Sequence, residues 1–323
     1  MKTPVAITIF NRPDTTKKVF EAIRQAKPEK LLVIADGPRA DKPGEAEKCA
    51  EARAIFDRVD WKCEVLTNFS EVNLGCGKRP YTGFDWVFSL VEEAIVLEDD
   101  CLPQPTFFRF CEEMLEKYRD NEQVMAINGS NWLKQWQSKR QSYHFSYFFS
   151  GWGWASWRST WQKYDFTMAG WQDPAVQQRI RDYIGSDRQF FRLKRDFDAA
   201  SDLISYDIWD YQFQYMCLIR SGLVVVPSVN LISNVGAGVD ATHTKDASNN
   251  RIDLFTYPMS FPLVEPQQVT LDRRFMSALY RRVWDNSLPS RIRRKSVALA
   301  ERLNYFKPAI DRYNNSSLLP TNH

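Results

Sequence analysis

The chain has 323 residues, of which 44% are hydrophobic and 26% are charged, and its formal net charge is +3. This composition supports a large folded domain and excludes a disordered or collagen-like chain, whereas the small net charge excludes no class of partner. Three histidines exclude a histidine-rich metal centre, and six cysteines without a Cys-x-x-Cys pair predict reduced thiols, as in a cytosolic protein.

The N-terminal part of the chain alternates apolar runs with helix-like segments. Strands are predicted over residues 4–10, 30–39, 63–69 and 93–100, and helices over 14–26, 44–57 and 73–91. The strand-like runs are continuously apolar, which predicts a mostly parallel sheet sandwiched by helices. Ligands bind such sheets at the carboxyl ends of the strands. Polar residues stand at these ends, namely Asn11, Asp36, Asn68 and the acidic residues 98–100.

The remainder of the chain is more mixed. Helices are predicted over 105–120, about 173–200 and 206–221, and strands over 124–132 and 223–236. Between them, residues 142–161 are rich in aromatic side chains and glycine. We expect a catalytic domain over 1–265, followed by a basic helical extension over 266–323 with a disordered end. Within the extension, 273–313 carries eleven Lys and Arg against three acidic residues.

The membrane relationship is predicted from the same patterns. No apolar window of about 18 residues occurs, so no transmembrane helix is expected, and the first apolar run is too short for a secretory signal. The stretch RIRRK at 291–295 is compatible with an interfacial helix on anionic lipid, but a solvated helix packed on the domain explains it equally well. We therefore expect a cytoplasmic location, with contact to the inner face of the membrane as an option.

The stretch AIVLEDD, residues 94–100, drives an apolar strand into three adjacent carboxylates. Such a cluster is costly unless a cation or hydrogen-bond donors compensate it. Oxygen ligands suit Mg²⁺ or Mn²⁺, which keep coordination positions open for a diphosphate. The alternative is a solvated acidic turn at a helix N-terminus. The preceding strand and the turn Leu-Pro-Gln-Pro favour a site.

Three segments together resemble a known family. VLEDDCLPQPTFF, SGWGWASWRSTW and DIWDYQFQYMCLIRSGLVVVPSVN resemble, in this order, the Glu-Asp-Asp, Gly-Trp and Trp-Asp segments of N-acetylglucosaminyltransferase I and related GT-A glycosyltransferases. The likeness covers residues 4–240 in patches. It implies a GT-A (Rossmann-like) fold and a nucleoside diphosphate sugar as the donor.

The resemblance also implies roles for residues on the donor side. Asp100 would bind the metal, Glu98 and Asp99 would face the ribose and donor sugar, and Asp36 would accept the N3–H of uracil. Arg79 either approaches the nucleotide or is an exposed charge in a turn. Further positions are expected to border the nucleotide sugar, namely Asn11, Arg12, Gly153 and Trp154.

Asp210 is the candidate base. An inverting transferase needs a group that takes the proton from the acceptor hydroxyl, and a carboxylate at the start of an apolar helix has its pKa raised by desolvation. Asp207, three residues earlier, is the alternative base. The competing interpretation is that both carboxylates cap the helix.

The remaining candidates are weaker. His243, with Asp240 beside it, lies in a loop after a strand and could complete a metal site or cover the diphosphate; it could equally be a loop histidine without a role. Most of the tryptophans are expected in the core, with one or two facing a sugar. Contacts to the acceptor or the sugar are predicted for Asn128, Ser130, Asn131 and Trp209, although turn chemistry also explains the first three.

These observations predict a metal-dependent inverting glycosyltransferase that moves a sugar, from a UDP-sugar by preference, to a glycan or glycolipid hydroxyl in bacterial cell-surface polysaccharide synthesis. One alternative is a sugar-phosphate nucleotidyltransferase, although the segment NRPDTTKK lacks the glycines that such enzymes carry after the first strand. Another is a non-catalytic carbohydrate-binding protein. No nucleic-acid partner is expected. The donor sugar, the acceptor and the oligomeric state depend on pocket shape and are left open by the sequence.

Overall fold

A computed structural model describes residues 1–202, 207–236 and 254–285. The chain divides into two compact units, Met1–Met276 and Ser277–His323. The predicted catalytic region, 1–265, falls within the first unit. A helix, α9 (Arg273–Val283), stands in the predicted extension, while its segment 291–295 lies outside the described residues.

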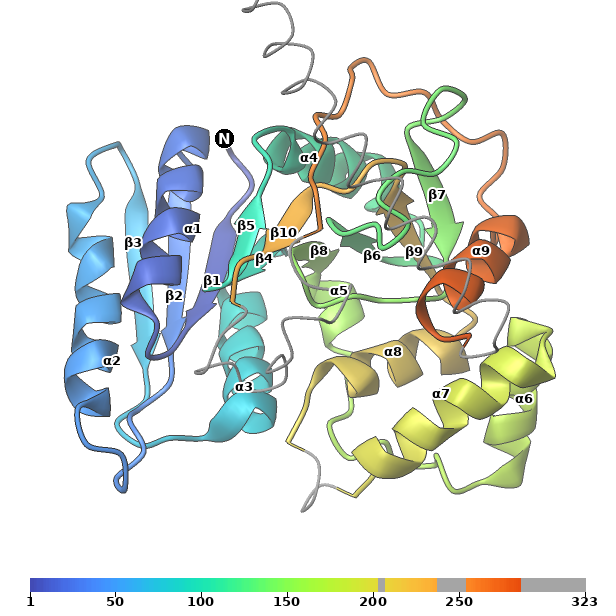
Figure 1. Ribbon diagram of the computed structural model, residues 1–323, viewed down its shortest axis with the longest axis horizontal. Helices are drawn as coiled ribbons and strands as arrows, with labels where there is room; N and C mark the ends of the chain where they lie inside the picture. The colour runs from blue at the N-terminus through green and yellow to red at the C-terminus, as the bar shows by residue number, and fades with distance from the viewer. Residues whose placement is uncertain (203–206, 237–253, 286–323) are drawn as a thin grey trace, which may run out of the picture. The chain divides into compact units, whose positions relative to one another are not determined.

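Four parallel strands form one side of the main sheet. They are β1 (Val5–Ile9), β2 (Lys30–Ala35), β3 (Glu64–Phe69) and β4 (Glu93–Glu98), in the spatial order β3-β2-β1-β4. The connections are α1 (Pro13–Ala26), α2 (Glu45–Ala54) with the 3₁₀ turn η1 (Ile55–Arg58), and α3 (Gly75–Leu90). Figure 1 shows this strand–helix alternation in blue and cyan. The predicted α/β class is confirmed.

The sheet continues with strands of mixed direction. In spatial order they are β8 (Trp154–Trp157), β6 (Val124–Asn128), β9 (Leu223–Pro227) and β7 (Tyr143–Ser146). β8 runs antiparallel to β4 and β6, whereas β6 and β9 are parallel. Because β8 is antiparallel to β4, the residues that precede β8 lie beside the carboxyl end of β4. A separate antiparallel pair joins β5 (Cys101–Pro103) to β10 (Ile232–Asn234).

The other helices flank this sheet. They are α4 (Thr106–Tyr118), the short α5 (Arg158–Trp161), α6 (Pro174–Ile184), α7 (Asp187–Ala200) and α8 (Asp210–Ile219). The single helix expected over 173–200 is two helices, because Gly185 takes a left-handed conformation (φ +68°) and ends α6. Helices α6, α7 and α8 pack together as one group (Figure 1).

Two hydrophobic clusters cover the two faces of the sheet, which explains the continuously apolar strands. Along β1, Val5, Ile7 and Ile9 belong to the cluster that includes apolar residues of α1 and α4, whereas Ala6 belongs to the cluster with residues of α3 and α8. Successive residues of a strand point to opposite faces, so both kinds of position must be apolar here.

The strand order places a topological switch point between β1 and β4. From β1 the chain moves outward to β2 and β3, and α3 then brings it back to β4 on the other side of β1. Open α/β sheets bind ligands outside the carboxyl ends of the strands at such a point. Residues that follow β1 and β4 therefore border the position where this fold is expected to bind a ligand.

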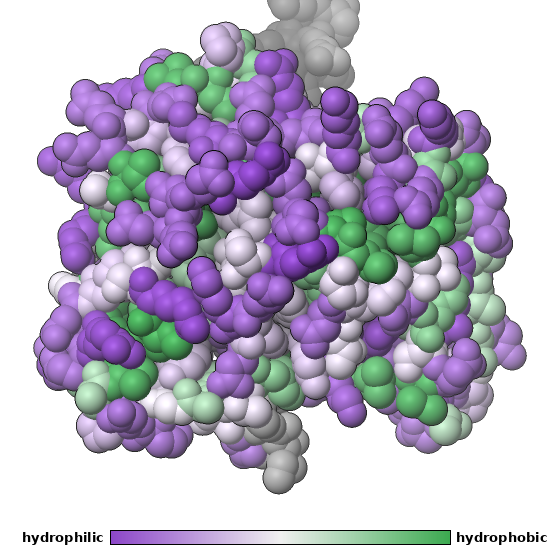
Figure 2. All heavy atoms as spheres, turned by 180° about the vertical axis from the view of Figure 1, so that it is seen from behind, coloured by the Kyte–Doolittle hydropathy of each residue, from purple (hydrophilic) through white to green (hydrophobic). Residues whose placement is uncertain are grey.

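None of the described helices is both long enough and apolar enough to cross a membrane. On the face shown in Figure 2, apolar areas are bounded by hydrophilic residues.

Candidate functional site

The carboxyl ends of β1 and β4 bring Arg12 against the acidic triplet. Arg12 Nη1 lies 2.9 Å from Asp100 Oδ2 and 3.6 Å from Asp99 Oδ1. Asp99 Oδ2 also accepts a hydrogen bond of 3.1 Å from the backbone N–H of Phe10. The triplet is therefore partly compensated by the guanidinium and the backbone of the neighbouring strand end, with Glu98 outside these contacts.

Two carboxylates of the triplet, Glu98 and Asp99, have raised pKa values. Burial, together with the charges of Asp100, Asp210 and Asp99, raises the pKa of Glu98 well above its ordinary range, and a hydrogen bond from the Trp209 side chain opposes the increase. Burial and the Asp100 charge raise the pKa of Asp99 to about 7, against the opposing effects of Arg12 and the Phe10 N–H. The site thus holds carboxylates whose ionisation needs further positive charge.

A metal ion fits the carboxylates of this cluster. Ligand atoms of Glu98, Asp100 and Cys101 all lie within 4.8 Å of one another. Burial and neighbouring acids raise the pKa of the Cys101 thiol well above its ordinary value, so it stays protonated and the two carboxylates are the better ligands. Carboxylate oxygens suit Mg²⁺ or Mn²⁺. His243 and Asp240 lie outside the described residues.

The chain after β10 covers Asp100. Its backbone N–H at Val235 donates a hydrogen bond of 2.8 Å to the Asp100 carbonyl. A Cβ atom on Gly236 would stand 2.3 Å from Asp100 Oδ2, so a residue without a side chain is needed at this close approach. The segment 237–253, which comes directly after, lies outside the described residues.

Asp210 is the first residue of α8 and is half-buried. Its Oδ1 is buried without a hydrogen-bond partner among the described residues. Burial raises the pKa of Asp210 to about 6, while its own N–H and that of Tyr211 oppose the change. The Asp210 charge contributes to the raised pKa of Glu98, which places the two carboxylates in one electrostatic environment. A carboxylate with a free oxygen and a pKa near 6 suits a general base.

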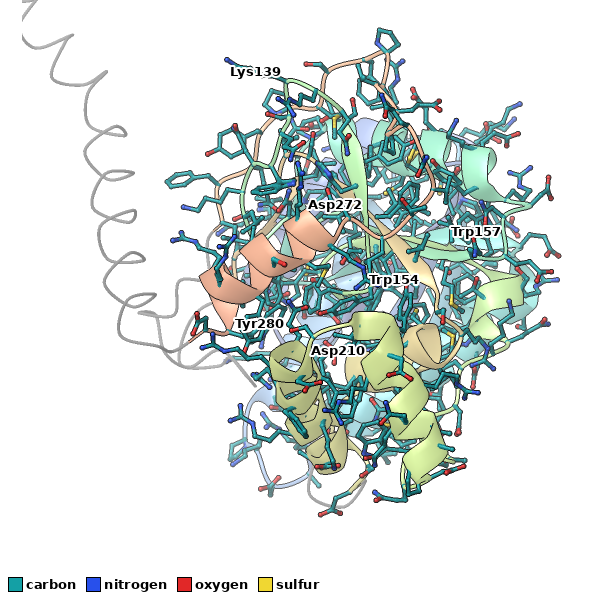
Figure 3. The ribbon with its side chains drawn as sticks, turned by 90° about the vertical axis from the view of Figure 1, so that its right-hand side faces the viewer. Lys139, Trp154, Trp157, Asp210, Asp272 and Tyr280 are labelled. Carbon is teal, nitrogen blue, oxygen red and sulfur yellow. The ribbon has the colours of Figure 1, made fainter. Side chains whose placement is uncertain are left out.

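The aromatic residues next to Asp210 are core side chains. Trp154 is fully buried, and its ring packs on that of Trp209 with centroids 5.5 Å apart. Phe84 and Phe149 surround the same pair. Figure 3 labels Trp154 on β8 and Asp210 at the start of α8. Trp154 therefore presents no ring face to a sugar. Trp209 is also buried, and its side chain hydrogen-bonds to Glu98 instead of lining an open groove.

Gly153 and Gly151 allow the chain before β8 to approach closely. Gly153 takes a left-handed conformation (φ +61°), and a Cβ there would stand 2.5 Å from Ile232. A Cβ on Gly151 would stand 3.0 Å from the Trp209 ring and 3.8 Å from the Asp210 Cβ. Both glycines therefore approach residues of the protein closely, including Gly153, which was expected to border the nucleotide sugar.

Asp36 was predicted to accept a hydrogen bond from uracil, but both of its carboxylate oxygens accept hydrogen bonds from the protein. Its Oδ1 accepts hydrogen bonds from the N–H groups of Gly37 and Leu74, and its Oδ2 accepts from Gly75 N–H and Asn73 Nδ2, all at 2.9–3.0 Å. The carboxylate thus holds the turn before α3 at the end of β2.

Arg79 is buried, which rules out the exposed-turn interpretation. Its guanidinium donates to the carbonyl oxygens of Ala35 and Asn68 and to Asn68 Oδ1. Arg79 therefore joins the carboxyl ends of β2 and β3. Beside them, Asn11 Nδ2 donates to Glu45 Oε1 at 2.9 Å, and Glu45 is also paired with Arg39. Asn11 thus stands at the predicted edge with its amide nitrogen already engaged.

Asp207 does not cap its own helix. Its carboxylate accepts hydrogen bonds from the N–H groups of Cys76 (2.8 Å) and Gly77 (2.6 Å), which belong to the first turn of α3. For Asp207 the alternative of capping its own helix is therefore wrong, and it instead caps a helix about 130 residues earlier in the chain. The Gly-Cys-Gly sequence at 75–77 is a signal for such a close approach.

Three residues at the end of β6 and just after it, which were predicted to contact an acceptor, are buried. Asn128 links to the backbone of Phe148 and Ser150, and the Ser130 hydroxyl donates to that of Ser150. The Asn131 side chain bonds the Pro227 carbonyl and the Leu133 N–H. All three hold turns together, which agrees with the turn-chemistry interpretation.

Comparisons with known proteins add little to this picture. No protein-family model matches the chain, and no curated protein matches it. Among solved structures it is similar to a UDP-glucose pyrophosphorylase in complex with UDP-glucose, at 8% identity and TM-score 0.37, covering 73% of this chain and 94% of that one. It is also similar to mouse xyloside xylosyltransferase 1 (10%, TM-score 0.33, 67% and 81%) and to the inositol-1-phosphate CTP transferase from T. maritima (10%, 0.35, 70% and 85%). Likenesses this weak carry no argument about activity.

Proposed function

We propose that the protein is a metal-dependent inverting glycosyltransferase that moves a sugar from a nucleoside diphosphate sugar, a UDP-sugar by preference, to a hydroxyl of a glycan or glycolipid. The observation that carries the proposal is the convergence of two features at the switch point. The acidic triplet meets Arg12 at the ends of β4 and β1, and Asp210, whose Oδ1 has no hydrogen-bond partner among the described residues, shares its electrostatic environment with Glu98.

Each residue of the site has its own role in the proposed reaction. Glu98 and Asp100 would hold Mg²⁺ or Mn²⁺, which would offset the negative charge of the donor diphosphate when bound. Asn11, Arg12 and Asp99 border the nucleotide. Asp210 takes the proton of the acceptor hydroxyl while the acceptor oxygen forms a bond to the anomeric carbon; the bond from that carbon to the diphosphate oxygen breaks, and the nucleoside diphosphate leaves with the electron pair.

Three expected roles change in this proposal. Asp36 shapes the turn before α3, because both of its oxygens already accept hydrogen bonds. Arg79 joins two strand ends. Trp154 is part of the core, as its complete burial requires.

The connection after β1 favours glycosyl transfer over the nucleotidyltransferase alternative. β1 ends at Ile9 and α1 begins at Pro13, so three residues join them. A glycine-rich loop that wraps a nucleoside triphosphate needs a longer connection. The non-catalytic alternative gives no reason for the half-buried, partly unsatisfied Asp210 carboxylate, which costs stability and suits a base.

The donor half of the proposal is tested by thermal shift with UDP, CDP, GDP, dTDP and ADP, each with and without Mn²⁺. Binding to the folded state raises the melting temperature, and we expect UDP with Mn²⁺ to give the largest increase. Asp100→Ala removes the Mn²⁺-dependent part of this increase. Asp182→Ala, at an exposed carboxylate of α6, is the matched control and keeps it. The proposal fails if no nucleotide shifts the wild-type protein, or if Asp100→Ala responds to Mn²⁺ as the wild type does.

A further inference from the structure

Asp207 connects two parts of the molecule that the chain separates by about 130 residues. Its Oδ2 accepts the N–H of Cys76 at 2.8 Å and its Oδ1 accepts the N–H of Gly77 at 2.6 Å. The thiol of Cys76 additionally donates to the Asp207 carbonyl at 2.9 Å. Asp207 is thus held through its side chain and its backbone to the first turn of α3.

The sequence of α3 is adapted to this carboxylate. A Cβ atom on Gly75 would stand 2.2 Å from Asp207 Oδ2, and one on Gly77 would stand 2.4 Å from Oδ1 and 2.8 Å from the backbone nitrogen of Ile208. Gly75 also takes a left-handed conformation (φ +84°) that other residues rarely adopt. Both glycines are therefore required where the carboxylate approaches.

Two aspartates share the start of this helix. The N–H groups of Leu74 and Gly75 bond to Asp36, and those of Cys76 and Gly77 bond to Asp207. The first N–H groups of a helix have no partner within the helix and need an external acceptor. Here one acceptor, Asp36, directly follows β2, and the other, Asp207, belongs to the segment that leads into α8.

That segment carries the proposed base. Asp207 is followed by Ile208, by Trp209, whose side chain hydrogen-bonds to Glu98, and by Asp210 at the first turn of α8. We propose that Asp207 is a positioning residue, which fixes the start of α8 against α3 and so places the Asp210 carboxylate relative to the donor. This inference rests on the proposed function, since it concerns the same site.

A role as the base is less consistent with the contacts. Both Asp207 oxygens already accept backbone hydrogen bonds, whereas Asp210 Oδ1 has no partner among the described residues. A misplacement of a reacting group by about 1 Å can cost about 100-fold in rate, so a positioning residue can matter as much as one that reacts.

The contact itself is tested through Cys76, without any substrate. Cys63 and Cys76 are the partly exposed cysteines, so a Cys63→Ser background leaves Cys76 as the accessible thiol for a maleimide probe, with peptide mapping to confirm the site. Burial and the Asp207 charge raise the pKa of this thiol to about 12. Asp207→Ala should increase the labelling rate about three- to fourfold for each pKa unit recovered, because the thiolate fraction rises about tenfold while each thiolate becomes a weaker nucleophile. Labelling at the wild-type rate would overturn the contact.

Positioning is tested by UDP release from UDP-glucose, UDP-galactose and UDP-N-acetylglucosamine with Mn²⁺, using water as the acceptor. We expect Asp207→Ala to lower kcat about 10- to 100-fold while KM stays within about twofold. The fall of kcat at low pH, which is the acidic limb of the pH profile, should remain because Asp210 is still present as the base. Asp207→Asn, which retains one acceptor oxygen, serves if the alanine variant does not fold. Asp173→Ala, at the N-cap of α6, is the control for losing a helix cap elsewhere.

The outcomes separate this inference from the proposed function. An unchanged kcat, a rise in KM alone, or loss of the acidic limb in the Asp207 variants overturns positioning, the last because it would make Asp207 the base. If the wild type neither binds UDP nor releases it, the proposed function fails, and positioning fails with it. The Cys76 labelling then still decides whether Asp207 holds α3.

Discussion

Replacing Asp210 with asparagine should stabilise the protein while abolishing transfer. Asp210 is half-buried, and one of its carboxylate oxygens has no hydrogen-bond partner in the described part of the chain; burial raises its pKa from the ordinary 3.8 to about 6. A difference of about two pKa units corresponds to about 3 kcal/mol between the charged and neutral forms, which we take as an upper value because Asp210 remains partly accessible. The asparagine side chain keeps the shape of the aspartate and removes its charge.

The sign of the effect is set by the direction of the shift. The folded-state pKa lies above the unfolded-state value, so ionisation of Asp210 costs stability. This cost is absent below about pH 3.8, grows between about pH 3.8 and 6, and is complete above. Asp210→Asn should therefore be more stable than wild type by up to about 3 kcal/mol near pH 7.5, and by about half as much near pH 5.

Urea unfolding followed by circular dichroism at these two pH values measures the difference. Asp182→Asn, at an exposed position of α6, is the control for removing a carboxylate and should change stability little. In the same preparations, the asparagine variant should retain the UDP-dependent thermal shift and lose UDP release. Equal or lower stability of Asp210→Asn near pH 7.5, or a difference that does not shrink near pH 5, would refute the electrostatic reasoning. Persistent transfer would refute the assignment of the base.

Three further substitutions test the site and its support. Glu98→Gln should raise the melting temperature without metal, because burial and the neighbouring carboxylates make ionisation of Glu98 unfavourable in the folded state, and should weaken the Mn²⁺-dependent shift. Arg79→Met should cost about 2–4 kcal/mol in urea unfolding, since it leaves buried carbonyl oxygens of β2 and β3 unpaired; a loss below about 1 kcal/mol would contradict this. Gly153→Ala should destabilise more than Gly44→Ala, because both glycines have positive φ but only at Gly153 would the new methyl group meet a neighbour, Ile232, at 2.5 Å. Equal losses of unfolding free energy in the two alanine variants would show that the contact with Ile232 has no cost.

Local patterns were sufficient for much of the fold. Continuous apolar runs between helical segments predicted the parallel strands β1 to β4. The division of 173–200 was missed, although Gly185 was a visible signal for it. The segments on both sides of Gly185 have helix periodicity, so the sequence pattern over 173–200 resembled one continuous helix.

The side-chain roles were harder to predict, because a residue type does not show which partner it meets. An aspartate at a strand end can face a ligand or hold a turn, and Asp36 holds a turn through four donors. A tryptophan in a Gly-Trp segment can face a sugar or fill the core, and Trp154 fills the core. Asp207 and Asp210 look alike in sequence, yet Asp207 bonds to α3, whereas Asp210 Oδ1 meets no hydrogen-bond donor within residues 1–202, 207–236 and 254–285.

The sequence by itself determined the α/β class, the order of the first elements and the presence of an acidic cluster at a strand end, because these depend on periodicity and local composition. Tertiary structure decided which carboxylates are compensated. Arg12 reaches Asp100 because β1 and β4 are neighbours, and Asp207 reaches Cys76 because the glycines of α3 leave room for it. Charge compensation acts over a few ångströms in space, and the strand order that sets those distances is not written in any single segment.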